Sequence, residues 1–123
     1  MKTVKLLEVN VPSKKGYLFS REVTEQIAQT EQALGTFYDP SSVELTIDLS
    51  KVSHIAKNLR LENDVLLADI EPLGTPMGNI LKELLTANTK LEFYPRGTGL
   101  LAEDGAISDY KLISIDVRHE TRA

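Results

Sequence analysis

The chain has 123 residues, of which 41% are hydrophobic and 26% charged, and it contains no cysteine. This composition is typical of one globular domain over residues 1–123, with enough chain for a single core. The lack of cysteine excludes disulfides, thiolate metal sites and a cysteine nucleophile. A formal charge of −4 gives no reason to expect nucleic-acid binding.

Neither a membrane span nor a signal peptide is expected. The longest apolar stretches fall far short of the ~20 residues that cross a bilayer. Residues 1–7 are followed at once by Glu8 and Asn10, so the start lacks the apolar core of a signal peptide. We therefore expect an intracellular location.

The first third of the chain predicts a strand and then a helix. Residues 3–9 have strand character. Ser20 is a typical helix N-cap, and Gly35 is a natural helix stop. Because apolar residues between them recur at helical spacing, a helix is predicted over residues 20–34; these residues are Val23, Ile27 and Leu34.

Strand patterns dominate the middle of the chain. Residues 43–49 alternate strictly between apolar and polar, which predicts a half-buried strand. Residues 52–61 fit either a helix or a strand. We favour a strand, because the Asn63-Asp64 dipeptide can turn the chain into a second strand over residues 65–70 and so form a hairpin.

The clearest helix start is Thr75-Pro76, since threonine caps well and proline at the first helical position loses no needed hydrogen bond. The predicted helix covers residues 76–87. Its apolar stripe consists of Met77, Ile80, Leu81, Leu84 and Leu85.

The last third of the chain predicts strands separated by glycine-containing turns. Residues 91–94 form a short strand, 95–99 a glycine-rich bend, 103–105 a turn and 107–117 a long strand. Hairpin-linked strands with two main helices predict an α+β domain with a largely antiparallel, barrel-like sheet.

Few residues suggest a catalytic, metal-binding or phosphate-binding site. Residues 95–99 lack the lysine and the strand-to-helix context of a phosphate loop. His54 and His119 are the only histidines, so no metal site and no cofactor are expected. Ser53 and His54 are neighbours on a predicted strand, and their side chains should point to opposite faces without a direct hydrogen bond.

Six segments occur in the order and spacing of a known family. They are residues 14–23, 33–40, 52–59, 75–85, 93–99 and 109–117. The most specific are Thr75-Pro76-Met77-Gly78, followed by a leucine-rich helix, and the closing strand that begins at Asp109 and ends at Val117. Together these segments resemble the prohead (capsid maturation) proteases of tailed phages, which share a fold with the herpesvirus assembly protease.

The sequence departs from that family at the positions that cut peptide bonds. The family's nucleophile belongs to a serine pair before Arg-Gly, and here Tyr94 and Pro95 precede Arg96. The family's histidine, which precedes a proline, matches Asp39. A phenol of pKa ~10 is a poor replacement for an activated serine. The resemblance therefore implies a pseudoprotease, with Tyr94, Pro95 and Arg96 as candidate binding residues.

A degenerate member of this family is expected to act by binding in capsid assembly, or as a head or core component. Its expected partners are capsid protein, scaffold protein or another copy of itself, and its expected location is the virion or the host cytoplasm. One alternative is an active serine endopeptidase with a rearranged site, in which His54 pairs with a distant serine. Another is a phage-encoded inhibitor of a host defence protein.

Overall fold

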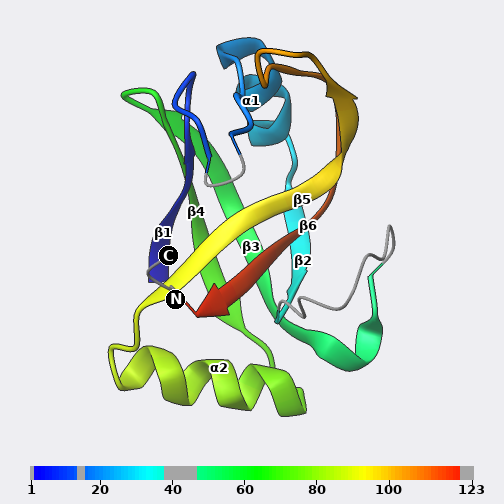
Figure 1. Ribbon diagram of the computed structural model, residues 1–123. Helices are drawn as coiled ribbons and strands as arrows, with labels where there is room; N and C mark the ends of the chain where they lie inside the picture. The colour runs from blue at the N-terminus through cyan, green and yellow to red at the C-terminus, as the bar shows by residue number, and fades with distance from the viewer. Residues whose placement is uncertain (1, 14–15, 38–46, 120–123) are drawn as a thin grey trace.

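The computed structural model describes residues 2–13, 16–37 and 47–119 (Figure 1). Two α-helices, one 3-10 helix (η1) and six strands alternate along this part of the chain. In chain order they are β1 (Lys2–Glu8), α1 (Arg21–Ala28), β2 (Gln32–Thr36), η1 (Leu49–Lys51), β3 (Val52–Glu62), β4 (Val65–Pro72), α2 (Pro76–Thr86), β5 (Leu91–Leu101) and β6 (Ile107–His119).

The strands form two antiparallel sheets. Four strands pair in the order β1-β4-β3-β2, and β5 pairs with β6. A single bridge between Phe37 and Val117 connects β6 to the end of β2. The α+β class, the two main helices and the antiparallel pairing are thus confirmed. The sheets do not close into a barrel within the described residues.

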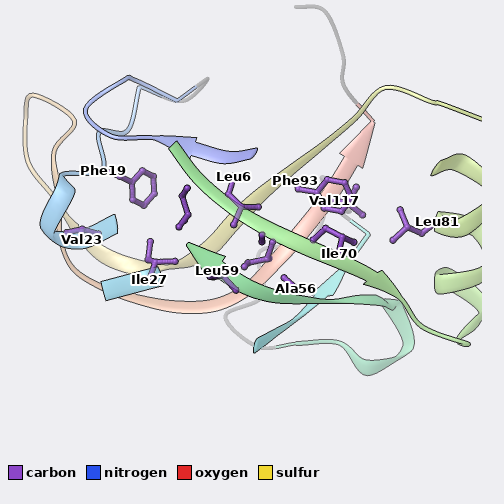
Figure 2. Packing of buried hydrophobic residues seen from close by; sticks show 13 residues of the cluster. Leu6, Phe19, Val23, Ile27, Ala56, Leu59, Ile70, Leu81, Phe93 and Val117 are labelled. Atoms are coloured by element: carbon purple, nitrogen blue, oxygen red, sulfur yellow. The ribbon is translucent and has the colours of Figure 1, made fainter. Parts of the chain in front are cut away.

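The core fills the space between the two sheets and extends to both helices (Figure 2). Val23 and Ile27 of α1 close one end, beside Phe19. Leu81 of α2 closes the other end. The remaining buried apolar side chains of this cluster come from the strands: Leu6, Ala56, Leu59, Leu66, Ala68, Ile70, Phe93, Ile115 and Val117.

The first helix begins as predicted but ends earlier. The Val23 backbone N–H donates to Ser20 Oγ at 3.2 Å, which is an N-cap. The helix ends at Ala28, and residues 32–36 form β2, so the prediction of helix through residue 34 was wrong. Strand pairing with β3 decides the local conformation, and Gly35 lies opposite His54 instead of ending a helix.

The strand predicted over residues 43–49 falls mostly outside the described residues. Its last described part is not a strand, because Leu49 begins η1. Asp48 caps this short helix, and its Oδ1 accepts hydrogen bonds from the Ser50 backbone N–H at 3.0 Å and from Ser50 Oγ at 2.6 Å. A side chain that captures nearby backbone in this way competes with a sheet.

The ambiguous segment after η1 is a strand, as favoured. β3 and β4 form a hairpin, and Asn63 and Asp64 in its turn have φ values of 50° and 65°. Two central residues with positive φ match the turn type that suits the twist of a two-residue hairpin.

The second helix begins at the predicted residue. Thr75 Oγ1 accepts from the Gly78 backbone N–H at 2.9 Å and donates to the Val52 carbonyl at 2.6 Å. The same hydroxyl therefore caps α2 and attaches it to the start of β3. Within the described residues, no helix is long and apolar enough to cross a membrane.

Residues 95–99 are not a bend between strands, as predicted, but part of the long strand β5. The register with β6 shifts between Arg96 and Gly97, and again between Thr98 and Leu100. A Cβ on Gly97 would lie 2.8 Å from Tyr110 Cζ and 2.2 Å from the Lys111 carbonyl oxygen. This glycine therefore allows the close approach of β6. The turn at residues 103–105 and the final strand are confirmed.

Replacing Thr75 with alanine should lower the free energy of unfolding by about 1–2 kcal/mol, because both the cap and the tie to β3 are lost. Thr75→Ser should retain most of this stability. Chemical denaturation of the two variants measures the difference. Thr86→Ala is the control, since that hydroxyl bonds only to the Lys82 carbonyl on an exposed turn of the same helix.

Candidate functional site

The candidate binding residues Tyr94, Pro95 and Arg96 lie in the first half of β5. They are opposite Asp116, Ile115 and Ser114 of β6, respectively. Asp39, the position that matches the family's histidine, lies outside the described residues. Three of the four positions that the sequence comparison with the family singled out are therefore consecutive residues of the two-stranded sheet.

Asp116 is the centre of a buried polar cluster on this sheet, and its side chain is only 2% exposed. Its Oδ2 accepts from Arg96 Nε at 2.6 Å. Its Oδ1 accepts from the Thr36 backbone N–H at 3.1 Å, from Thr36 Oγ1 at 3.0 Å and from Ser114 Oγ at 2.8 Å. A buried carboxylate needs such partners, and here they connect β2, β5 and β6.

Tyr94 belongs to a second charged group on the same face. The Arg118 guanidinium lies 4.6 Å from the centre of the Tyr94 ring, a cation–π contact. Arg118 also donates from Nε and from one terminal nitrogen to the two oxygens of Glu92, both at 3.2 Å. The Tyr94 ring is therefore half-buried beneath an arginine that a bidentate ion pair holds in place.

Ser53 and His54 do form a direct hydrogen bond, contrary to the sequence prediction. Ser53 Oγ lies 2.6 Å from His54 Nδ1. Strand alternation alone was a poor guide, because Nδ1 is bonded to Cγ and stays near the backbone, within reach of the preceding hydroxyl. Both residues are fully buried because β3 is covered on both faces.

The second nitrogen of His54 fixes the protonation state of the ring. Nε2 lies 2.6 Å from the Ile115 carbonyl oxygen, which can only accept, so Nε2 carries the proton and donates. Nδ1 then accepts from the Ser53 hydroxyl. Burial lowers the pKa of His54 below its ordinary value of 6.5, although the bond to Ile115 and the nearby charge of Asp116 act in the opposite direction. The ring is neutral near pH 7.

This arrangement has the local geometry of a nucleophile, its base and a group that orients the base. Access is the missing element, because neither Ser53 nor His54 has any exposed surface. The loop before α2 and the first turn of this helix lie against Ser53. The Ser53 carbonyl accepts from the Leu73 backbone N–H at 3.0 Å, and a Cβ on Gly78 would lie 2.9 Å from the same carbonyl oxygen. In this conformation the pair connects β3 to β6 and cannot contact a peptide.

Gly35 makes the contact between His54 and β6 possible. A Cβ at this position would lie 2.0 Å from His54 Nε2 and 2.0 Å from the Ile115 carbonyl oxygen. No side chain fits at such distances. β2 can therefore pass this close to the hydrogen bond between His54 and Ile115 only because residue 35 is glycine.

Thr36, Ser114 and Asp116 were not predicted as site residues from the sequence. Asp116 alternates with Ile115 and Val117, a pattern that predicts an exposed side chain on the polar face of a strand, so nothing in the sequence indicated that this carboxylate is buried. No group of three or more histidine or acidic side chains that could hold a metal occurs in the described parts of the chain.

The fold is similar to that of a phage capsid assembly protease. Among solved structures, the chain is similar to the capsid assembly protease gp21 of bacteriophage T4, with a TM-score of 0.79 and 18% sequence identity. The alignment covers 96% of this chain and 80% of that chain. No protein-family model and no curated protein matches the sequence.

Gly35→Ala should destabilise the domain by about 3 kcal/mol or more, since the added methyl group displaces His54 or β6 and leaves buried polar groups without partners. Gly74→Ala is a matched control, because a Cβ there meets nothing within 4 Å. Thermal unfolding of both variants measures the effect. Equal melting temperatures would contradict the close packing of Gly35 against His54.

The buried neutral His54 should make the protein less stable in mild acid. Its folded pKa is below 6.5, so as the pH falls through 6.5 the unfolded chain takes up a proton that the folded chain does not. The free energy of unfolding should therefore decrease between about pH 7.5 and about pH 5.5, as the imidazole of the unfolded chain becomes protonated. Urea denaturation at several pH values measures this decrease.

Two variants assign this decrease to one histidine. His54→Gln should remove it, whereas His119→Gln, at the exposed end of β6, should retain it. If His54→Gln does not fold, NMR titration of the wild-type rings replaces it, and protonation of His54 near pH 6.5 would contradict the assignment. Asp69 and Glu71 titrate outside this range, because hydrogen bonds from Asn58 and Lys57, respectively, lower the pKa values of these carboxyls below 3.8 and 4.5.

Proposed function

We propose that this protein is a catalytically inactive relative of the phage prohead proteases. In this proposal it acts by binding during assembly of a tailed-phage head, with capsid protein, scaffold protein or another copy of itself as its partner, in the virion or the host cytoplasm. Support comes from the fold shared with a capsid assembly protease and from the side chains at the positions that match the family's serine pair.

The observation that carries the proposal is that the charged side chains around Tyr94 on the β5–β6 sheet are bound to one another. Arg96 binds the carboxylate of Asp116, and Arg118 covers the Tyr94 ring. A protease needs an activated hydroxyl next to a base at this location. Tyr94 and Pro95 offer no aliphatic hydroxyl, and the charged groups beside them are engaged with each other. Such a surface is suited to recognition, because tyrosine and arginine are frequent interface anchors.

The alternative of an active serine endopeptidase now centres on Ser53, since this hydroxyl bonds to a histidine that a third group orients. Ser53 could act only if α2 moved away from β3 or if the two sheets separated. The fully buried state of both side chains favours a structural role. Labelling and cleavage assays distinguish the two functions.

The purified protein should not cleave the capsid or scaffold proteins of its phage, and serine-reactive phosphonates should not label it. Mass spectrometry after overnight incubation measures both. Pro95→Ser should not restore activity, because Asp39 cannot act as the general base that histidine provides. Stoichiometric labelling of Ser53 that Ser53→Ala abolishes would establish the alternative instead.

Tyr94→Ala should weaken binding of the capsid or scaffold partner at least about tenfold, as expected for an interface tyrosine. Tyr94→Phe should bind nearly normally, because it keeps the ring under Arg118. Glu103→Ala, in the distal turn of the β5–β6 hairpin, is the control that should change little. Isothermal titration calorimetry gives the affinities. A lower melting temperature with unchanged affinity would show that Tyr94 serves packing alone.

A further inference from the structure

One edge of the four-stranded sheet has no hydrogen-bonded partner strand within the described residues, although β5 packs close to β1. β1 is the terminal strand of this sheet and pairs only with β4. Across residues 2–13, 16–37 and 47–119, no strand pairs with its other edge. Alternate backbone N–H and C=O groups of an antiparallel edge strand point away from its neighbour, so β1 presents unused hydrogen-bonding groups on that side.

A hollow of about 420 Å³ lies beside this edge, between β1, the end of α2 and the start of β5. Figure 1 shows these three segments converging near the N-terminus. Its apolar lining comes from Val4, Leu85, Leu91 and Phe93. The hollow is open to solvent on one side, so it suits a segment that lies along the surface better than an enclosed small molecule.

The charge around the hollow is positive, although the chain as a whole is acidic. Lys2 and Lys5 of β1 line it and are exposed, and Lys90 immediately precedes Leu91. The one acidic residue in the lining, Glu92, is paired with Arg118. Glu8 offsets part of this charge, because it forms an ion pair with Lys5. A partner with carboxylates complements the remaining charge.

We propose that this edge binds an extended acidic peptide segment by strand addition to β1. The main chain of the segment pairs with the open edge of β1. Apolar side chains on one face of the segment pack over Val4 and Phe93, and carboxylates on its other face contact Lys5, while Lys2, on the Val4 face, adds positive charge at the end of the strand. Recognition of this kind combines main-chain hydrogen bonds with pockets for alternate side chains.

This site is separate from the Tyr94 face. Glu92 lies between the two regions, because it lines the hollow and also binds Arg118, which covers the Tyr94 ring. Tyr94, Pro95 and Arg96 do not line the hollow. Failure of strand addition at β1 would therefore leave the function proposed for Tyr94 unaffected.

The competing explanation for Lys2 and Lys5 is protection, because lysines on edge strands discourage association with other strands. The two explanations differ in their consequences. A protective edge binds no peptide of either charge, whereas a recognition edge selects acidic over basic segments.

The test uses a fluorescent peptide of about eight residues that alternates valine and glutamate, with fluorescence anisotropy as the readout. The full chain should bind this peptide, and the double variant Lys2→Glu, Lys5→Glu should bind it about tenfold or more weakly. Lys82→Glu, on the exposed side of α2 and outside the hollow, is the charge-reversal control and should bind normally. A peptide of alternating valine and lysine should not bind.

Two further measurements test the binding mode. N-methylation of alternate peptide residues should abolish binding when it removes the N–H groups that donate to β1. Chemical-shift changes in NMR spectra should be largest for the backbone amides of β1. Binding that is insensitive to the lysine reversal or to N-methylation, or no binding at all, overturns the proposal. A dimer formed through β1 without peptide, detected by analytical ultracentrifugation, would identify a second copy as the occupant and also overturn it.

Discussion

The fold depends on one constraint, which is that every polar group buried where the two sheets meet must find a partner across the junction. Asp116 obtains its partners from β2, β5 and its own strand, and His54 obtains one from the Ile115 carbonyl. A buried carboxylate or imidazole without partners costs several kcal/mol. The hydrogen bonds therefore select one orientation of the β5–β6 hairpin against the larger sheet, which apolar packing alone would leave less defined.

Both clusters depend on the same short stretch of β6. Ser114, Ile115 and Asp116 supply a hydroxyl, a carbonyl and a carboxylate, and successive side chains alternate between the two faces of the strand. The core face contributes Ile115, opposite Pro95, and the other face contributes the ion pair with Arg96. The Asp116 cluster therefore fixes Arg96 on the face that also carries Tyr94. In the binding function proposed above, side chains held in this way lose little conformational freedom on contact with a partner.

Sequence patterns predicted those elements whose signals are local. Thr75-Pro76 and Asn63-Asp64 act within a few residues, and both features occur where expected. The wrong predictions concern residues whose conformation is determined by contacts with segments distant in sequence. Ala33 and Leu34 are compatible with a helix by sequence, but they pair with β3 and form a strand. Gly35 was interpreted as a helix stop, but glycine is needed there because His54 occupies the space of a side chain. The Ser53–His54 bond was excluded by strand alternation, a rule that concerns directions from the backbone and not the reach of a ring nitrogen. Tyr94, Pro95 and Arg96 were singled out through the family resemblance, since nothing in the composition distinguishes them.

The length of chain between bonded partners has a consequence for how the molecule assembles. His54 reaches its acceptor 61 residues later, and Thr36 reaches Asp116 across 80 residues. During synthesis, β2 and β3 leave the ribosome long before β6 exists, so their polar side chains remain hydrated until the last strand is made. The β3–β4 hairpin can form early, while the junction between the sheets has to wait for the nearly complete chain. Contacts so distant in sequence slow folding, because loop closure precedes any gain from pairing. A chain cut short before Ile115 would retain its local hairpin and helix caps but lack the hydrogen bonds that fix one sheet against the other.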